Sequence, residues 1–430
     1  MEIRMVDTRR TEVLIVGAAG HGMAPISAYL TGINGHVYIH DRNMNSLAMK
    51  ELMELGCTIV DDTIPTEVEM LIYSSSVPLS HHLIVQGRKL GVRILSRGDW
   101  IASLPKDRLI AVAGSHGKTS TAWFLVQILR LRGLRPSMII GGRDSEGRVL
   151  GFAGSSTDPI VLEVDDTDGS ILKSNAFQCI LLNVEDDICL VDNQSTEDIF
   201  NAWLTKTEAT RLYVPAATEF PKRIASTLAS LGDKVMRVQV PPTKRRIPRH
   251  IAINIAVAAQ CGEEIVSDEG NHLGVSLAEM IDSIDQPLSR NFETSLRSGL
   301  WHLYRDAADH PGEIKVVLSE LRRLHPKRVI HVVQQVSRFS RAIKYREGYL
   351  SALSLADRVT VLPIDPKGER LEQDVDPEKI RSSLIPPNVV ESMGFPLQEN
   401  NEKVLIAVLG DGQAVDEWMQ NFTRQYGALY

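Results

Sequence analysis

The sequence predicts an α/β protein in which helices cover mostly parallel sheets. Short runs of β-branched and other apolar residues recur along the chain, and segments with helical spacing fall between them. Most of the apolar runs are continuous rather than alternating, which is typical of strands buried on both faces of a parallel sheet. Because this alternation continues through all 430 residues, we expect layered α/β domains throughout.

The chain is about three times as long as a typical domain, which predicts two or three domains. The expected strands are residues 13–16, 37–40, 70–73, 92–95, 109–113, 160–164, 179–182, 329–333, 359–362 and 404–409. Polar stretches near 103–106 and between 287 and 298 interrupt this series. We therefore predict a Rossmann-like N-terminal domain over 1–104, a central P-loop domain with a parallel sheet over 105–296, and a Rossmann-like C-terminal domain over 297–430.

Composition excludes several classes of protein. Hydrophobic residues make up 43% of the chain and aromatic residues 5%, and the formal net charge is −7. This balance argues against nucleic acid as the main partner, although residues 244–246 form a local basic cluster. No apolar stretch approaches about 18 residues, so we expect no membrane span. We also expect no signal peptide, because the first ten residues include no apolar core.

The four cysteines are widely separated and form no C-x-x-C pair. Cys179 and Cys261 lie in apolar runs, so we expect buried thiols of a reducing compartment rather than disulfides. The protein is therefore predicted to be cytoplasmic.

The strongest motif follows the expected strand 109–113 and precedes a segment in which Trp123, Phe124, Ile128 and Leu131 repeat at helical spacing. Its glycines allow backbone N–H groups to surround phosphate oxygens, and the following helix start favours negative charge. The spacing is G-x-x-G-K-T, because Val112 occupies the position of a further glycine. We predict an ATP site formed by Gly114, Ser115, His116, Gly117, Lys118, Thr119 and Ser120.

An acidic segment follows the expected strand 160–164 and includes Glu163, Asp165, Asp166 and Asp168. Acidic residues after a strand are more often helix caps or solvated loops. Next to a phosphate loop, however, a carboxylate at a strand end can complete a Mg²⁺ site. We therefore predict Thr119 and Glu163 as metal ligands, with Lys118 and Glu163 as catalytic residues.

A second glycine-rich turn follows the first expected strand. It contains Gly17, Gly20, His21 and Gly22, and Asp41 follows the next strand. This order is typical of Rossmann-type nucleotide sites, but the spacing G-x-x-G-x-G only weakly supports a dinucleotide. We expect some nucleotide phosphate to bind here, and a turn without a ligand remains the alternative.

Taken in order, these segments resemble the Mur ligase family, and the resemblance covers essentially the full chain. Its most specific parts are residues 113–121, Ala-Gly-Ser-His-Gly-Lys-Thr-Ser-Thr, and residues 163–170, which are similar to E-A-D-E-S-D-x-S. Further similar segments are 17–23 with Asp41, 74–78, 95–97, 250–256, 290–293, 306–314 and 335–341.

The resemblance implies an ATP- and Mg²⁺-dependent amide ligase of peptidoglycan biosynthesis. Its substrates would be a UDP-N-acetylmuramate-like acid, bound by the N-terminal domain, and an amino acid or peptide, bound by the C-terminal domain. The ligase would phosphorylate the acid, and the incoming amine would displace phosphate from the acyl phosphate. The implied site residues are Ser75 and the glycine turn for the UDP-sugar, His250, Asn254 and Arg290 for ATP, Asp306 and His310 for catalysis, and Arg338 and Arg341 for the carboxylate of the amino acid.

Several positions depart from the family pattern. Ile188 stands where the family has a metal-holding histidine, although Asp186 and Asp187 are nearby in sequence. Other departures are Ile251 for an asparagine, Ala307 for a tyrosine, and Asp309 and Ser337 for histidines. Two alternatives therefore stay open: an impaired homologue that binds nucleotide and acts as a regulator or partner, and an enzyme that phosphorylates a different acid. The residues leave the oligomeric state and both substrate specificities open.

Overall fold

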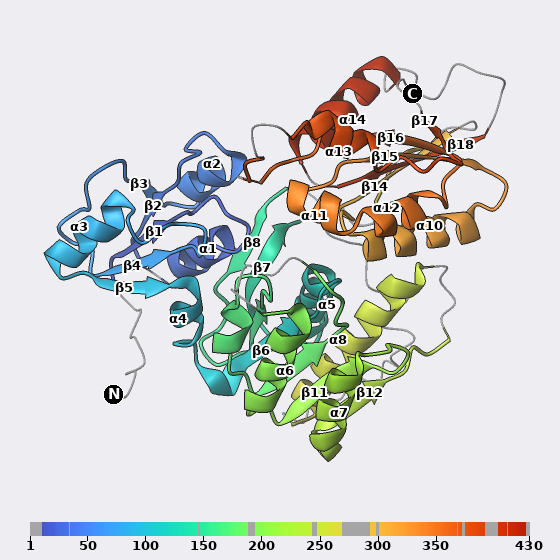
Figure 1. Ribbon diagram of the computed structural model, residues 1–430. Coiled ribbons are helices and arrows are strands. Elements are labelled where there is room, and N and C mark those ends of the chain that lie inside the picture. Colours follow the sequence, from blue (N-terminus) through green and yellow to red (C-terminus); the bar gives the residue numbers. More distant parts are fainter. Residues whose placement is uncertain are drawn as a thin grey trace. The chain divides into compact units, whose positions relative to one another are not determined.

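Figure 1 shows the computed structural model of the chain. It describes residues 11–33, 35–144, 147–187, 194–242, 247–268, 293–297, 301–367, 369–371, 375–391, 403–410 and 412–426. The chain forms two compact units, Met1–Leu288 and Ser289–Tyr430. Both contain parallel sheets covered by helices, so the predicted α/β fold class is confirmed.

The first sheet of unit 1 has the strand order β3-β2-β1-β4-β5, and all its neighbouring strands are parallel. Its elements are β1 (Val13–Val16), α1 (Ala24–Gly32), β2 (Val37–His40), α2 (Leu47–Glu54), β3 (Thr58–Ile59), β4 (Met70–Tyr73), α3 (His82–Leu90), β5 (Arg93–Ser96) and α4 (Arg97–Ile101). The strand order reverses at β1, which is where ligands bind in doubly wound sheets, and the glycine turn follows this strand.

The second sheet of unit 1 has the order β12-β11-β10-β6-β9-β7-β8, in which β8 alone pairs antiparallel. Its strands are β6 (Leu109–Ala113), β7 (Ser137–Arg143), β8 (Val149–Phe152), β9 (Ile160–Glu163), β10 (Gln178–Leu181), β11 (Arg211–Pro215) and β12 (Val235–Val238). Its helices are α5 (Lys118–Leu131), α6 (Thr196–Lys206), α7 (Lys222–Ser230) and α8 (Arg249–Asp268), with short 3₁₀ turns η1 (Lys106–Arg108), η2 (Ser170–Lys173) and η3 (Gly232–Lys234).

Helices α5 and α8 pack side by side through a shared apolar core (Figure 1). Phe124 and Ile128 of α5 are buried in that core, as their spacing predicts, whereas Leu131 is 61% exposed. Leu131 is the last residue of the helix, and this turn faces solvent. The core fixes the start of α5, and with it the phosphate loop, against the sheet.

The two sheets of unit 1 are joined by contacts between α1 and the β7–β8 hairpin. A side chain at Gly151 would collide with the backbone of Pro25, so the hairpin approaches α1 as closely as a backbone can. In addition, Glu51 of α2 forms an ion pair with Arg143 of β7, with 2.7 Å between Oε2 and Nη1.

Unit 2 has one sheet, with the order β13-β14-β18-β15-β16-β17, in which β13 alone pairs antiparallel. Its strands are β13 (Glu293–Arg297), β14 (Trp301–Asp306), β15 (Val329–Gln334), β16 (Arg358–Val361), β17 (Val390–Glu391) and β18 (Val404–Leu409). Its helices are α10 (Pro311–Leu324), α11 (Phe339–Lys344), α12 (Arg346–Leu353), α13 (Pro377–Ser382) and α14 (Gln413–Tyr426). Strand β13 spans the predicted boundary at 296/297, and the division into three domains remains a prediction.

All ten expected strands exist, with ends that move by at most one residue. Strands β3, β7, β8, β11, β12, β13, β14 and β17 were not expected. Glycines interrupt the apolar pattern in β7 and β8, and polar residues interrupt it in β12 and β14. Cys57, Cys179 and Cys261 are free and buried, as the sequence predicts for the last two. No helix in the described part of the chain is long and apolar enough to cross a bilayer. Cys189, Ile188, Arg290 and the basic cluster 244–246 lie outside the described residues.

Candidate active site

The phosphate loop connects the central strand β6 to the first residue of α5. Gly114 has a φ of +143° and Gly117 a φ of +81°, conformations that favour glycine. A Cβ at Gly117 would also lie 3.0 Å from Nδ2 of Asn254, so α8 packs directly against the loop. The backbone therefore turns as a phosphate-binding loop requires, and Asn254, predicted at the ATP site, lies beside it.

Lys118 points into this loop rather than into solvent. Its Nζ donates to the carbonyl oxygen of Gly114 at 2.7 Å and to Oδ1 of Asp166 at 3.0 Å. Burial by itself would lower the pKa of Lys118, but the charges of Asp166, Asp165 and Glu163 outweigh burial and raise it. The lysine therefore carries a positive charge where the phosphates of a nucleotide would lie.

Thr119 and Glu163 lie next to each other at the ends of α5 and β9. The Thr119 hydroxyl donates to Oε1 of Glu163 at 2.9 Å, and the Gly141 amide donates to Oε2 at 2.8 Å. Strand pairing brings Glu163 here, because it lies in register with Val112 of β6. Burial raises the pKa of Glu163 despite the positive charge of Lys118. A hydroxyl beside a carboxylate is a donor set that suits Mg²⁺, and the predicted pair therefore fits that ion.

The segment after β10 holds the other side of the loop. Asn183 accepts from the His116 amide through Oδ1 at 2.9 Å, and its backbone carbonyl accepts from the Ser115 amide. Glu185 lies 3.2 Å from Nε2 of His116. No role was assigned to Asn183 or Glu185 from the sequence. Their role in shaping the loop follows from the pairing of β10 with β6.

The N-terminal glycine turn is closed by Asp41, one of its predicted ligand-binding residues. Oδ2 of Asp41 accepts from the Ala19 amide at 2.9 Å, and Gly17 has a φ of +85°. A Cβ at Gly17 would lie 2.9 Å from that of Ser74, so the segment that follows β4 packs closely against the turn. His21, also in the turn, is exposed.

Arg97 connects this turn to the acidic segment, and sequence reasoning gave it no role of its own. Its Nη1 lies 3.3 Å from Oδ2 of Asp168 and 3.7 Å from Oδ2 of Asp165. A Cβ at Gly22 would collide with this guanidinium, so the glycine turn lies against it. The Nε of Arg97 is buried without a hydrogen-bond partner among the described residues.

Ser75 also contacts the acidic segment. Its hydroxyl donates to Oδ2 of Asp168 at 3.0 Å, across 93 positions of the sequence. Asp168 is therefore contacted by two side chains of the N-terminal region, Arg97 of α4 and Ser75, which follows β4. The charges of Arg97 and Lys118 outweigh burial and lower the pKa of Asp165.

Helix α8 carries the two described residues predicted near the adenine. Asn254 is 8% exposed and lies against Gly117, and His250 stands one turn earlier on the same helix. Ile251, which departs from the family pattern, is 5% exposed and belongs to the core between α5 and α8.

In unit 2, Asp306 and His310 lie at the carboxyl end of β14. Asp306 accepts from the Ala308 amide at 2.9 Å, and Nδ1 of His310 accepts from the Gly312 amide at the start of α10. Glu313 completes a capping box with His310. Both predicted catalytic residues thus order the β14–α10 turn.

Arg338 and Arg341 lie at the start of α11, also at the carboxyl edge of this sheet. Arg338 has a φ of +70°, which is strained for a residue with a side chain. Nη1 of Arg341 donates to Oδ2 of Asp309 at 2.7 Å. Arg341, which is predicted to bind the carboxylate of the amino acid, is therefore already paired with a carboxylate of the same unit.

The chain is similar in sequence and in structure to known proteins. No protein-family model matches the chain. It is 25% identical over 454 residues to a UDP-N-acetylmuramate–L-alanine ligase of Aquifex aeolicus, covering 98% of this chain and 99% of the relative. The structure of UDP-N-acetylmuramate–alanine ligase from Thermotoga maritima superimposes with a TM-score of 0.72 at 17% identity, over 98% of this chain and 100% of that one. A murein peptide ligase from Psychrobacter arcticus gives a TM-score of 0.63 at 17% identity, over 96% and 98%.

These relatives and solved structures confirm the resemblance to the Mur ligase family that the sequence shows. The chain is similar over nearly its full length to UDP-N-acetylmuramate–L-alanine ligases, and it shares its fold with a murein peptide ligase.

Proposed function

We propose that the protein is an ATP-dependent ligase that joins an amine to a UDP-N-acetylmuramate-like carboxylate through an acyl phosphate. One observation carries the proposal: the buried Lys118 and the Thr119–Glu163 pair meet where β6, β9 and α5 converge. Such a group can stabilise the charge of a transferring phosphoryl group. The reaction would take place in the cytoplasm, where ATP is available.

In the first step, an oxygen of the donor carboxylate attacks the γ-phosphorus, and the bond to the β-phosphate oxygen breaks. Lys118 would stabilise charge on the γ-phosphoryl oxygens, and the loop amides from Gly114 onward would hold the β-phosphate. Thr119 and Glu163 would hold a Mg²⁺ ion, which when bound neutralises phosphate charge. Asn254 and His250 would contact the adenosine end.

The donor would bind at the N-terminal glycine turn. Arg97 has a buried N–H without a partner among the described residues and lies against Gly22. An anionic group of the donor would satisfy that N–H. Ser75 and Asp41 would complete the donor site. Because Arg97 also contacts Asp165 and Asp168, donor binding would be linked to the acidic segment beside Lys118.

In the second step, the amine nitrogen of the acceptor attacks the acyl carbon. The new C–N bond forms, the C–O bond to phosphate breaks, inorganic phosphate leaves, and the amine loses its proton. Residues of unit 2, including Asp306 and His310, would orient the acceptor. Exclusion of water from the acyl phosphate would favour the amine over hydrolysis.

The test is phosphate release from ATP, Mg²⁺ and UDP-N-acetylmuramate with a broad panel of amines. We expect release that needs both the donor and an acceptor, with a matching amide product in the mass spectrum. Absence of turnover across the panel, with ATP binding retained, would favour the impaired homologue instead. A different acid recovered with the protein would favour phosphorylation of another substrate.

A further inference from the structure

A charge cluster lies at the carboxyl edge of the sheet in unit 2. We call it the acceptor-edge cluster, and it consists of Asp309, Ser337, Arg338, Arg341 and Glu369. Within it, Oδ2 of Asp309 accepts from Nη1 of Arg341 at 2.7 Å and also from the Ser337 hydroxyl. Nη1 of Arg341 also lies 3.1 Å from Oγ of Ser337. Two of the departures from the family pattern, Asp309 and Ser337, therefore contact each other and the same arginine.

The backbone of Asp309 is held from two sides. The Tyr349 hydroxyl donates to its carbonyl oxygen at 2.6 Å, and its amide donates to Oε2 of Glu313 at 3.3 Å. The side chains of Asp309 and Arg341 are 20% and 12% exposed. A pair this enclosed is screened less by solvent than an ion pair on the surface. Asp309 is thus positioned on Arg341 by the fold of α10 and α12.

The second arginine also has an acidic neighbour. Nη1 of Arg338 lies 3.9 Å from Oε1 of Glu369, and the Ser340 amide donates to Oε2 of Glu369 at 3.0 Å. The two arginines and the two acids of the cluster therefore balance in charge.

A carboxylate from solution would have to displace the carboxylate of Asp309 from Arg341. Asp309 is attached to the same chain as Arg341, so its effective concentration at the arginine is high. A freely diffusing carboxylate must compete with that effective concentration. Removing it would also leave a largely enclosed aspartate without its arginine, which is costly. Arg341 is therefore a poor anchor for the α-carboxylate of a free amino acid.

We propose that Asp309 is a specificity-determining residue that selects acceptors whose neighbouring carboxyl group is absent or blocked. The acceptor is then an amine such as an amino-acid amide, rather than an α-amino acid with a free carboxylate. This inference rests on the proposed ligase function, because it assigns the class of amine that unit 2 receives.

The experiment is a binding competition on the full chain with a non-hydrolysable ATP analogue, Mg²⁺ and UDP-N-acetylmuramate present. Alanine and alaninamide at equal concentration are observed by saturation-transfer NMR, and their affinities are compared. We expect alaninamide to bind at least about 10-fold more tightly than alanine, and Asp309→Asn to shift this ratio toward alanine by about 10-fold. Stronger binding of alanine to the unsubstituted chain, or no signal from either compound in any variant, would overturn the proposal.

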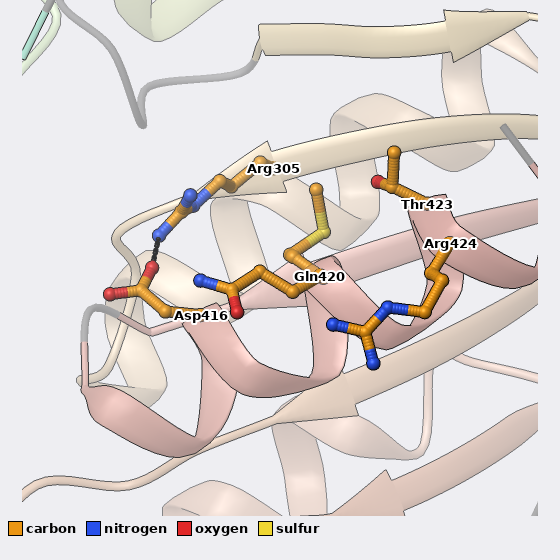
Figure 2. A pocket seen from close by; sticks show the side chains of 6 residues that line it. Arg305, Asp416, Gln420, Thr423 and Arg424 are labelled. Carbon is orange, nitrogen blue, oxygen red and sulfur yellow. Dashed lines mark hydrogen bonds and ion pairs between the residues drawn. The ribbon is translucent and has the colours of Figure 1, made fainter.

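A matched control comes from a different Asp–Arg pair of the same unit. Figure 2 shows Asp416 of α14 beside Arg305 of β14 in a surface pocket also lined by Gln420, Thr423 and Arg424. Asp416→Asn removes the same charge from an ion pair outside the acceptor-edge cluster, so the alanine-to-alaninamide ratio should stay unchanged. Asp309→Ser, which also removes the charge, provides a second variant if Asp309→Asn does not fold. An equal shift in the Asp416→Asn control would contradict the proposal.

Hydroxylamine separates this inference from the proposed function. It is small, lacks a carboxylate and captures acyl phosphates as hydroxamates. We expect the unsubstituted chain to form hydroxamate from UDP-N-acetylmuramate. Absence of hydroxamate would count against the proposed function for that acid. Hydroxamate formation with a preference for alanine would leave the ligase function intact and overturn the acceptor class.

Discussion

Lys118 and Asp166 form an enclosed ion pair, in which Nζ and Oδ1 are 3.0 Å apart and the side chains are 16% and 4% exposed. The same ammonium group donates to the Gly114 carbonyl, so it fills the loop that would hold phosphate. Phosphate oxygens would therefore replace the carboxylate of Asp166 as hydrogen-bond acceptors of Lys118. The charge is built into the site before any nucleotide binds, which is the preorganisation that phosphoryl transfer requires.

Replacing Lys118 with methionine should abolish this preorganisation. The charge on the γ-phosphoryl group would lose a donor, and Asp166 would stay buried without its cation. We expect ATP-dependent phosphate release to fall by about 10²–10³-fold or more. Steady-state kinetics with saturating donor and acceptor would measure it. Lys106→Met, at an exposed lysine paired with Glu208, is the control and should leave the rate unchanged. Near-normal turnover in Lys118→Met would remove the catalytic role assigned to this lysine.

The Glu163 carboxylate is the proposed second partner of the metal ion. Glu163→Gln preserves size and an acceptor for the Gly141 amide but removes the charge. We expect the Mg²⁺ concentration that gives half-maximal turnover to rise by about 10-fold or more, because Mg²⁺ prefers carboxylate oxygens. A Mg²⁺ titration of phosphate release would test this. An unchanged titration curve would show that the ion is held without Glu163.

Substitutions at two glycines of unit 1 distinguish the effect of backbone strain from the effect of the contact between the phosphate loop and α8. Gly117 and Gly147 both have a φ of +81°, but a Cβ at Gly117 would press on Asn254, whereas one at Gly147 would meet nothing within 4 Å. Each alanine substitution should cost about 1–2 kcal/mol of unfolding free energy from backbone strain. Only Gly117→Ala should also weaken ATP binding, by about 10-fold or more. Calorimetric titration with a non-hydrolysable ATP analogue would measure the affinities. Equal affinities in the two variants would show that the Asn254 contact does not matter for binding.

His331 of β15 makes unit 2 sensitive to acid. It is fully buried, and burial together with the charge of Arg358 lowers its pKa from 6.5 to about 4. Between these values the unfolded chain binds the proton and the folded chain does not. The stabilisation is therefore present above pH 6.5 and is lost as the pH falls toward about 4. The loss approaches about 3 kcal/mol at most.

Guanidinium unfolding of the full chain at about pH 7 and about pH 5 would test this dependence. His331→Asn should reduce the difference between the two unfolding free energies. An identical pH dependence in His331→Asn and the unsubstituted chain would exclude His331 as the source.

Local sequence predicted the strands that are continuous apolar runs but not those that polar residues interrupt. Strand β14 reads Trp-His-Leu-Tyr-Arg-Asp and is a strand because it lies between β13 and β18. Similarly, β7 contains Gly141 and Gly142, which tertiary packing accommodates because Thr119 and Glu163 lie against them. In both strands, sheet neighbours outweigh the preference of the segment itself.

The sequence by itself determined the layered α/β class, the phosphate loop and the acidic strand end that contains Glu163. Those features depend on short segments, because glycine conformation, helix start and strand end are read within a few residues. Tertiary structure alone decided that Arg97 reaches Asp168 and that Asp309 occupies Arg341. Those contacts join residues far apart in sequence, and only the order of strands in each sheet brings their ends together.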